Sequence, residues 1–155
     1  RKNVQIRLCA VGRMRKSAEQ AIFDAYTARL RPALTLQEID IRQKLPPERL
    51  TAREGEMLLA ATAQAEIIVA LDERGDTPNS RAFARKLARW RDDGVREIAF
   101  LIGGADGLSD QVRNSAHYTL SLGALTWPHL MVRGLLAEQL YRAQQINAGH
   151  PYHRD

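Results

Sequence analysis

Apolar and polar positions alternate along the chain in two different rhythms. Short apolar runs, some continuous and some with an apolar residue at every second position, have the pattern of strands buried in a sheet. Longer stretches between them have apolar residues at every third or fourth position, which indicates amphipathic helices. The predicted strands are residues 4–11, 34–41, 66–71, 97–102 and 118–122, and the predicted helices are residues 17–30, 51–65, 80–93 and about 128–148.

This succession of strands and helices predicts an α/β fold. Strand, helix and strand in repeated order favour a mostly parallel sheet with helices on both faces. Ser17 and Ser80 stand at the start of two predicted helices, where a hydroxyl can cap the first turn. We expect loops at the Pro46–Pro47 pair and over residues 73–80, and a single domain over residues 1–155.

The composition excludes several classes of protein. With 45% hydrophobic and 26% charged residues, the chain resembles an ordinary globular domain. No apolar run reaches membrane-spanning length, and Gln5 and Arg7 interrupt the first apolar segment, so we expect no secretory signal and a cytoplasmic protein. Cys9 is the only cysteine, which excludes an internal disulfide and a cysteine-based metal site. We expect Cys9 to fill the core, and we expect no metal.

The charge balance is compatible with a polyanionic partner. The net charge is +5, and 19 of the 23 basic residues are Arg, a side chain that pairs with phosphates and stacks on bases. This favours a nucleic acid. A GC-rich genome would produce the same excess of Arg, so composition alone leaves RNA binding open.

Three loops follow predicted strands at the edge of a parallel sheet where ligands usually bind, and they begin after Leu71, Ile102 and Leu122. The second has three glycines, Gly103, Gly104 and Gly107, but their spacing is not that of a dinucleotide-binding loop and no Lys stands where a phosphate loop needs one. A tight turn before a short helix capped by Ser109 or Asp110 is the simpler interpretation. The third, "LSLGALTWPH", offers backbone groups that could bind an adenine edge, or it could be core packing.

The last predicted helix has one broad apolar face and a surplus of apolar residues outside it. Glu138 and Arg142 are one helical turn apart, and a surface ion pair of that kind contributes only about 0.3–0.5 kcal/mol. The surplus residues suggest a partner subunit. The core face comprises Val132, Leu135, Leu136, Leu140, Ala143 and Ile146, and the surplus comprises Leu130, Met131 and Tyr141.

Three segments of the sequence resemble SPOUT methyltransferases of the RlmH type. They are "LIGGADGLS", "LSLGALTWPHLMVRGLLAEQLYRA" and the final "HPYHRD", and the resemblance extends from "LCAVGRM" to Asp155. It implies transfer of a methyl group from S-adenosylmethionine to N3 of a pseudouridine in 23S ribosomal RNA of the large subunit. It further implies action on assembled ribosomes, a homodimer, and a C-terminal trefoil knot, a topology that reasoning from residues alone would reject because knots are very rare.

The resemblance also implies a cofactor site and a set of catalytic residues. Arg142, Tyr152 and Arg154 would position the target base, while His129 and Glu138 would shape the pocket. His153 could take the N3 proton, although His129 or Glu138 could serve instead, or a neighbouring Arg could lower the proton affinity of N3 without a base. The implied cofactor-binding residues are Leu71, Gly103, Leu122, Gly123, Ala124, Leu125, Thr126 and Trp127.

Three other functions remain as alternatives. A non-catalytic ribosome-binding factor could keep this fold without the reaction, although the intact "HPYHRD" and "GALTWPH" argue against it. An unrelated phosphate-handling enzyme is disfavoured because the glycine loop lacks a Lys. A methyltransferase of the same fold could act on transfer RNA. Only the family resemblance excludes this alternative, although the small size of the chain fits a ribosome target better.

Overall fold

A computed structural model describes residues 3–155 of the protein, and its five strands form one sheet in which every neighbouring pair is parallel. The order of the strands across the sheet is β2-β1-β4-β3-β5. This confirms the parallel sheet expected from the sequence. The strands are β1 (Gln5–Val11), β2 (Thr35–Ile39), β3 (Ile67–Asp76), β4 (Glu97–Ile102) and β5 (Tyr118–Leu120).

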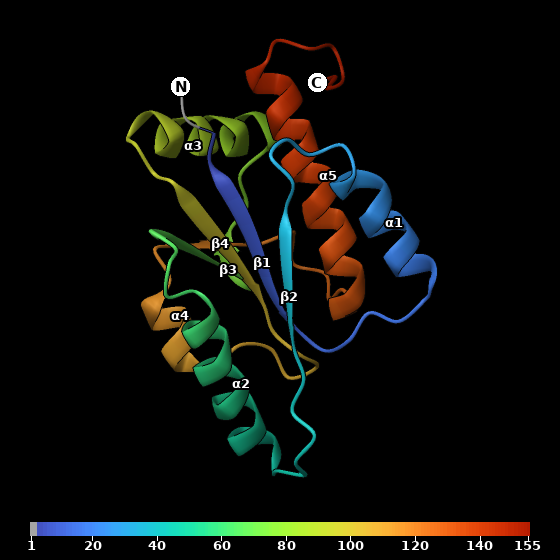
Figure 1. The fold of residues 1–155 in the computed structure, drawn as a ribbon, viewed down its shortest axis with the longest axis vertical. Coiled ribbons are helices and arrows are strands. Elements are labelled where there is room, and N and C mark those ends of the chain that lie inside the picture. The colour runs from blue at the N-terminus through green and yellow to red at the C-terminus, as the bar shows by residue number, and fades with distance from the viewer. Residues whose placement is uncertain (1–2) are drawn as a thin grey trace.

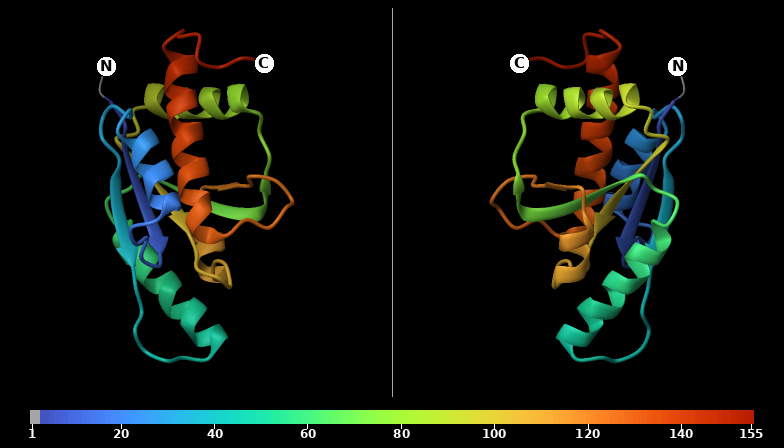
Figure 2. Two further views of the ribbon diagram at one scale, coloured as in Figure 1. Left: turned by 90° about the vertical axis from the view of Figure 1, so that its right-hand side faces the viewer. Right: turned by 90° about the vertical axis from the view of Figure 1, so that its left-hand side faces the viewer.

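Helices cover both faces of this sheet, as Figure 1 shows. One face carries α1, α3 and α5, with α5 in contact with both of the others, and the opposite face carries α2 and α4. Figure 2 shows that α3 crosses close to the end of α5 and that the last residues of the chain turn back above the start of α3. The helices are α1 (Ala18–Thr27), α2 (Pro47–Ala61), α3 (Ser80–Asp92), α4 (Asp110–Ser115) and α5 (His129–Asn147).

Alternate residues of the central strands point into two separate cores. In β1, Leu8 packs into the core under α1, α3 and α5, while Cys9 packs into the core under α2 and α4. In β4, Phe100 and Leu101 divide in the same way. Burial on both faces explains why these strands are almost continuously apolar in sequence. The burial of Cys9 confirms its expected role, and burial raises the pKa of its thiol to about 11.

Several predicted boundaries are wrong, for identifiable reasons. Helix α3 is capped by Asn79 rather than Ser80, because the Asn79 side chain accepts the amide of Ala82 at 2.8 Å. Helix α2 begins at Pro47, four residues before its predicted start. Proline fits the first turn of a helix because the amides there have no intrahelical partner, so its missing N–H costs nothing. The caps at Ser17 and Ser109 are confirmed.

The largest difference from the sequence-based expectation lies in β3. The predicted loop over residues 73–80 begins with four residues that belong to the strand. Leu71 and Asp76 both pair with Leu120 of β5, so the residues between them form a bulge. Gly75 is required there because a Cβ would lie 2.5 Å from the carbonyl oxygen of Thr119. The bulge contains three charged residues, Asp72, Glu73 and Arg74.

Among residues 3–155, no helix is both long and apolar enough to cross a membrane. The expected trefoil knot stays a prediction.

Candidate active site

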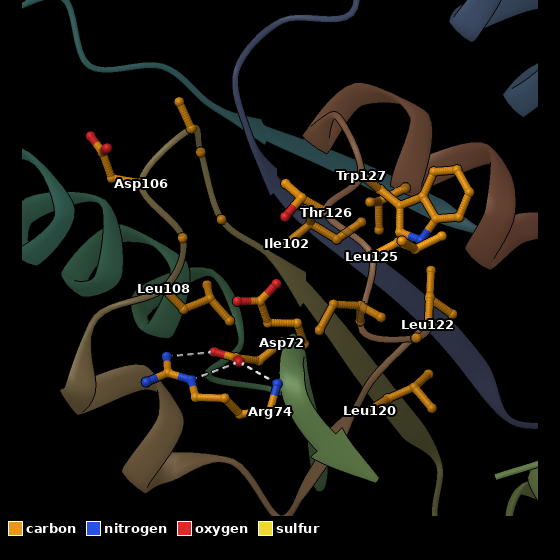
Figure 3. A pocket seen from close by; sticks show the side chains of 18 residues that line it. Asp72, Arg74, Ile102, Asp106, Leu108, Leu120, Leu122, Leu125, Thr126 and Trp127 are labelled. Carbon is orange, nitrogen blue, oxygen red and sulfur yellow. Dashed lines mark hydrogen bonds and ion pairs between the residues drawn. The ribbon is translucent and has the colours of Figure 1, made fainter. Parts of the chain in front are cut away.

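A cavity of about 390 Å³ lies where β3, β4 and β5 end. In Figure 3 the glycine loop with Asp106 and Leu108 faces Leu122, Leu125 and Trp127 across the cavity, and Asp72 lies between the two sides. All three loops singled out in the sequence therefore meet at one site. Of the expected cofactor-binding residues, Leu71, Gly103, Leu122, Gly123, Leu125, Thr126 and Trp127 line the cavity, whereas Ala124 does not.

The glycine loop forms one wall through a tight turn, as its sequence indicates. The amide of Gly107 donates to the carbonyl of Gly104 at 3.0 Å, and Gly107 has a φ of 79°. A Cβ at Gly103 would lie only 2.5 Å from the carbonyl oxygen of Gly107, so any larger residue would push the turn apart. Glu54 of α2 is buried beneath this loop, and burial raises the pKa of its carboxyl.

The opposite wall is the segment between β5 and α5. Ser121 is buried, and its hydroxyl both accepts the amide of Gly123 at 3.0 Å and donates to the Gly123 carbonyl at 3.1 Å. Gly123 has a φ of 116°, and the space where its Cβ would stand is free of neighbours within 4 Å. A ligand can thus approach the backbone here without meeting a side chain.

Charged residues from the β3 bulge and from the glycine loop make this cavity acidic. The Asp72 side chain, only 6% exposed, accepts the Arg74 side chain at 3.0 Å on each oxygen, and this hydrogen bonding holds the pKa of its carboxyl below the usual value. Arg113 of α4 stands 4.0 Å from the same carboxylate. Three carboxylates, those of Asp72, Glu73 and Asp106, line the cavity against the single guanidinium of Arg74.

A second cavity, of about 570 Å³, adjoins the first and has the opposite charge character. The two share Leu120, Leu122 and Gly123 as lining residues. The second cavity is walled by the first turn of α3 and by the end of the chain. It is lined by Arg81, His153 and Arg154 with one carboxylate, that of Asp155.

The final residues fold back onto α5 around the carboxylate of Glu138. Glu138 accepts Arg142 through Nη2 at 2.6 Å and Nε at 3.3 Å, the Tyr152 hydroxyl at 2.9 Å, and the Gln139 amide at 3.0 Å. Arg142 also stacks on the Tyr152 ring, 4.8 Å from its centroid. Burial, followed by the hydrogen bond to Glu138, raises the pKa of Tyr152 to about 12, so the phenol stays protonated at neutral pH. The pair seen in the sequence is therefore the centre of a network.

His153 extends this network and links it to α3. Its Nδ1 lies 3.0 Å from Nη1 of Arg142, and because a guanidinium can only donate, Nδ1 accepts and Nε2 carries the proton of the neutral ring. That Nε2 lies 3.0 Å from the Asp155 carboxylate, which also accepts Nε of Arg81 at 2.7 Å. A chain of hydrogen bonds from Arg142 through His153 and Asp155 to Arg81 thus joins α5 to α3 through the tail.

His129, by contrast, lies at the other end of α5. It packs against Gly12, whose Cβ would stand 3.5 Å from its Nε2, and Arg142 is about 20 Å further along the helix axis. Burial, with a smaller contribution from Arg133, lowers the pKa of His129. The structure does not bring His129 together with Glu138 or the tail, and it lines neither cavity described above.

Sequence reasoning missed Arg133, which is fully buried beside His129. Its guanidinium pairs with Glu38 and donates to the carbonyls of Val11 and Gly12 at 3.3 and 2.9 Å. This Arg ties α5 to the ends of β1 and β2. A helical pattern that places Arg133 next to Leu136 and Ala137 on the buried face is the signal that could have identified it.

Within the described residues, 3–155, no group of three or more His, Cys, Asp or Glu side chains is placed to hold a metal ion.

Comparisons with known proteins agree in one family. A family model described as a predicted SPOUT methyltransferase matches residues 4–153. The chain is similar to the ribosomal RNA large subunit methyltransferase H of Rhodospirillum centenum, with 53% identity over 95% of this chain and 97% of that protein. It is also similar to the protein of the same name from Paramagnetospirillum magneticum, with 48% identity over 97% of this chain and 99% of the relative.

Among solved structures, the chain resembles a probable methylase family protein from Haemophilus influenzae. The TM-score is 0.57, with 18% identity over 99% of this chain and 71% of the other. At this identity the likeness concerns the fold alone.

Proposed function

Since the chain belongs to the SPOUT methyltransferases of the RlmH type, we propose that it transfers a methyl group from S-adenosylmethionine to N3 of a pseudouridine in 23S ribosomal RNA of the large subunit. The observation that carries this proposal is the pair of adjoining cavities of opposite charge. A cationic methyl donor suits the acidic cavity, and an anionic RNA suits the basic one. Their shared wall at Leu122 and Gly123 is where donor and target would meet.

The acidic cavity fits the proposed cofactor in both charge and shape. When bound, S-adenosylmethionine supplies an electrophilic methyl group on a positively charged sulfur. Asp72, Glu73 and Asp106 give the cavity a surplus of negative charge that favours such a cation. Gly103 and Gly123 carry no side chain, so an adenine ring can approach the backbone closely between the apolar side chains of Leu122 and Ile102.

The tail residues supply alignment on the RNA side. Holding two reactants in the reactive orientation lowers the barrier by roughly 7–11 kcal/mol. A positioned base typically raises the rate by 10²–10⁴-fold, which corresponds to only about 3–5 kcal/mol. Arg142 and Glu138 fix the Tyr152 ring, which is suited to stacking on a base. Arg154 is exposed at the basic cavity, where its guanidinium can stabilise the negative charge that develops as N3 loses its proton.

The tail arrangement bears on which group removes the N3 proton. Glu138 already accepts four hydrogen bonds, and Nδ1 of His153 accepts from Arg142 while Nε2 carries a proton. His153 can act as a base through Nε2 only after Arg142 releases Nδ1. We therefore assign the larger part of N3 activation to Arg154, which stabilises the deprotonated base, while the N3 proton passes to solvent water.

We test the function by transfer of labelled methyl from S-adenosylmethionine to ribosomes from a strain lacking the gene, followed by nucleoside analysis. Label in 3-methylpseudouridine of the large-subunit RNA supports the proposal. Assembled ribosomes should accept the label and separated subunits should not. Cofactor binding without label on either would contradict the proposal and reopen the transfer RNA alternative.

Arg154→Ala separates the two roles of the site. We expect unchanged affinity for S-adenosylmethionine, measured by calorimetry, and turnover reduced at least about 10²-fold, as for removal of one stabilising donor. Equal loss of affinity and turnover would contradict the division between a cofactor cavity and an RNA cavity.

We further propose that the enzyme acts in the cytoplasm as a homodimer. Exposed apolar residues gather around the first half of α5: Leu125 and Trp127 precede the helix, Met131 lies in its first turn, and Ile22 of α1 packs over Gly134. Exposed apolar surface of this kind is typical of subunit contacts.

A further inference from the structure

The Asp155 carboxylate is held at the mouth of the basic cavity like a bound anion. Both of its oxygens lie near Nε of Arg81, at 2.7 and 3.0 Å, and Nε2 of His153 donates to it from the other side at 3.0 Å. The hydrogen bond from Arg81 holds the pKa of this carboxyl below its usual range, so it is ionised at neutral pH.

The surroundings of this carboxylate are those of a phosphate site. Arg81 lies in the first turn of the 13-residue helix α3, whose dipole favours an anion at this end. Thr77 adds a hydroxyl group to the cavity wall, and Arg154 adds a further cation. The cavity shares three residues with the proposed cofactor site, so an anion here would lie next to the reacting base.

We propose that Arg81, His153 and the first turn of α3 form a binding site for a backbone phosphate of the RNA substrate, and that the Asp155 carboxylate occupies it until RNA displaces it. This inference rests on the proposed function. It adds a phosphate contact on α3, outside the residues that the family resemblance implied, and makes the end of the chain an internal competitor of the substrate.

Displacement of the carboxylate costs little free energy. The side chains of Arg81 and Asp155 are 48% and 69% exposed, and exposed ion pairs of this kind contribute little to stability. A phosphodiester can offer the same two nitrogen atoms an equivalent charge with additional acceptor oxygens. When Asp155 leaves, the tail loses its tie to α3, and the exposed Arg154 can move toward the bound nucleotide while Tyr152 stays held by Glu138.

The test compares Arg81→Gln and Asp155→Asn by fluorescence anisotropy with a short labelled single-stranded RNA. Arg81→Gln removes the side chain that would bind the phosphate, so this variant should bind the RNA about tenfold more weakly. The slope of log affinity against log salt should fall by about 0.7, the value for one phosphate contact. Loss of the competitor should make Asp155→Asn bind two- to fivefold more tightly. Arg89→Gln removes the same charge further along α3 and should match the wild type.

The two variants distinguish this site from a structural ion pair. If the pair only holds the tail, breaking it from either side has the same effect, and equal weakening by Arg81→Gln and Asp155→Asn would overturn the proposal. Arg81→Gln behaving like Arg89→Gln would also overturn it. Because anisotropy requires no methyl transfer, these outcomes are independent of the labelled-methyl assay. The same variants should change the KM for ribosomes in the same directions and leave affinity for S-adenosylmethionine unaltered.

Discussion

Arg133 carries a positive charge into a region of the protein that excludes water. Its Nη atoms are satisfied by Glu38 and two backbone carbonyls, whereas Nε has no hydrogen-bond partner in the part of the chain that the structure describes. A buried charge of this kind is tolerated because its partners are fixed in place. Glu38 also accepts the backbone amide of Met14 at 2.8 Å. Burial alone would raise the pKa of the Glu38 carboxyl, but the hydrogen bonds from Met14 and Arg133 outweigh it and lower the pKa.

Arg133→Met should therefore destabilise the protein far more than the loss of a surface ion pair. We expect the free energy of unfolding in urea to fall by about 3 kcal/mol, because Glu38 and the carbonyls of Val11 and Gly12 lose their donor. Arg13→Met, which removes an exposed partner of Asp40, should cost less than about 1 kcal/mol. Adding Glu38→Met to Arg133→Met should restore part of the loss. Similar effects of Arg13→Met and Arg133→Met would contradict this role.

His129 should titrate below its ordinary value of 6.5, because burial and then the charge of Arg133 disfavour its protonated form. Because the pKa of His129 is lower in the folded protein, the unfolded chain becomes protonated at a higher pH than the folded one as the pH falls. The stability contributed by neutral His129 is thus fully present above pH 6.5 and declines as the pH falls toward the folded-state pKa. Proton NMR titration, with His129→Gln to assign the resonance, measures the midpoint. A midpoint at or above 6.5 would falsify this account.

Individual side chains were predictable where their function follows from local sequence. Cys9 in a strand and Ser109 before a short helix needed only their neighbours. Arg133 was not, because its partners come from β1 and β2, over 90 residues away. The contacts of Glu138 were predictable only in part. Its helical spacing from Arg142 indicated that pair, but nothing in the sequence around it indicated the hydrogen bond from Tyr152.

The glycine loop after β4 is the element on which the proposed cofactor cavity depends. Gly103→Ala would put a Cβ 2.5 Å from a backbone oxygen of Gly107, and backbone cannot move aside as a flexible side chain can. We expect calorimetric affinity for S-adenosylmethionine to fall at least tenfold. Gly94→Ala is a matched control, since its φ of 89° imposes strain but no atom lies within 4 Å. It should lower stability by about 1 kcal/mol and leave cofactor affinity unchanged. Equal cofactor affinity in both variants would contradict the loop's role.

The strands and helices themselves followed closely from the pattern of apolar residues. Every predicted strand and long helix is present, and the errors lie at boundaries. The most consequential one is β3, because its bulge over residues 72–75 depends on pairing with β5 and no local pattern indicates it. The acidic character of the cavity therefore became visible only in three dimensions.

The way the tail folds across two helices could not be read from the chain. Residues 152–155 are polar enough to be solvated, and their contacts with Glu138 and Arg81 join positions 14 and 74 residues apart. The family resemblance indicated that the tail matters for the reaction. The pairing of Asp155 with α3 instead follows from the way α3 crosses the end of α5, so that the tail reaches back over the start of α3, as Figure 2 shows.

The exposed apolar residues around α5 provide a test of the proposed dimer. Ile22 is 52% and Met131 is 39% exposed, and both belong to the face of the sheet that carries α1 and α5. A charge at either position would be buried without a partner in an interface, so Ile22→Glu and Met131→Glu should halve the mass measured by light scattering. Ala60→Glu adds the same charge on α2, across the sheet, and should leave the dimer intact. A dimer that survives both changes would have to use another surface. A wild-type chain with the mass of one protomer would contradict the dimer itself.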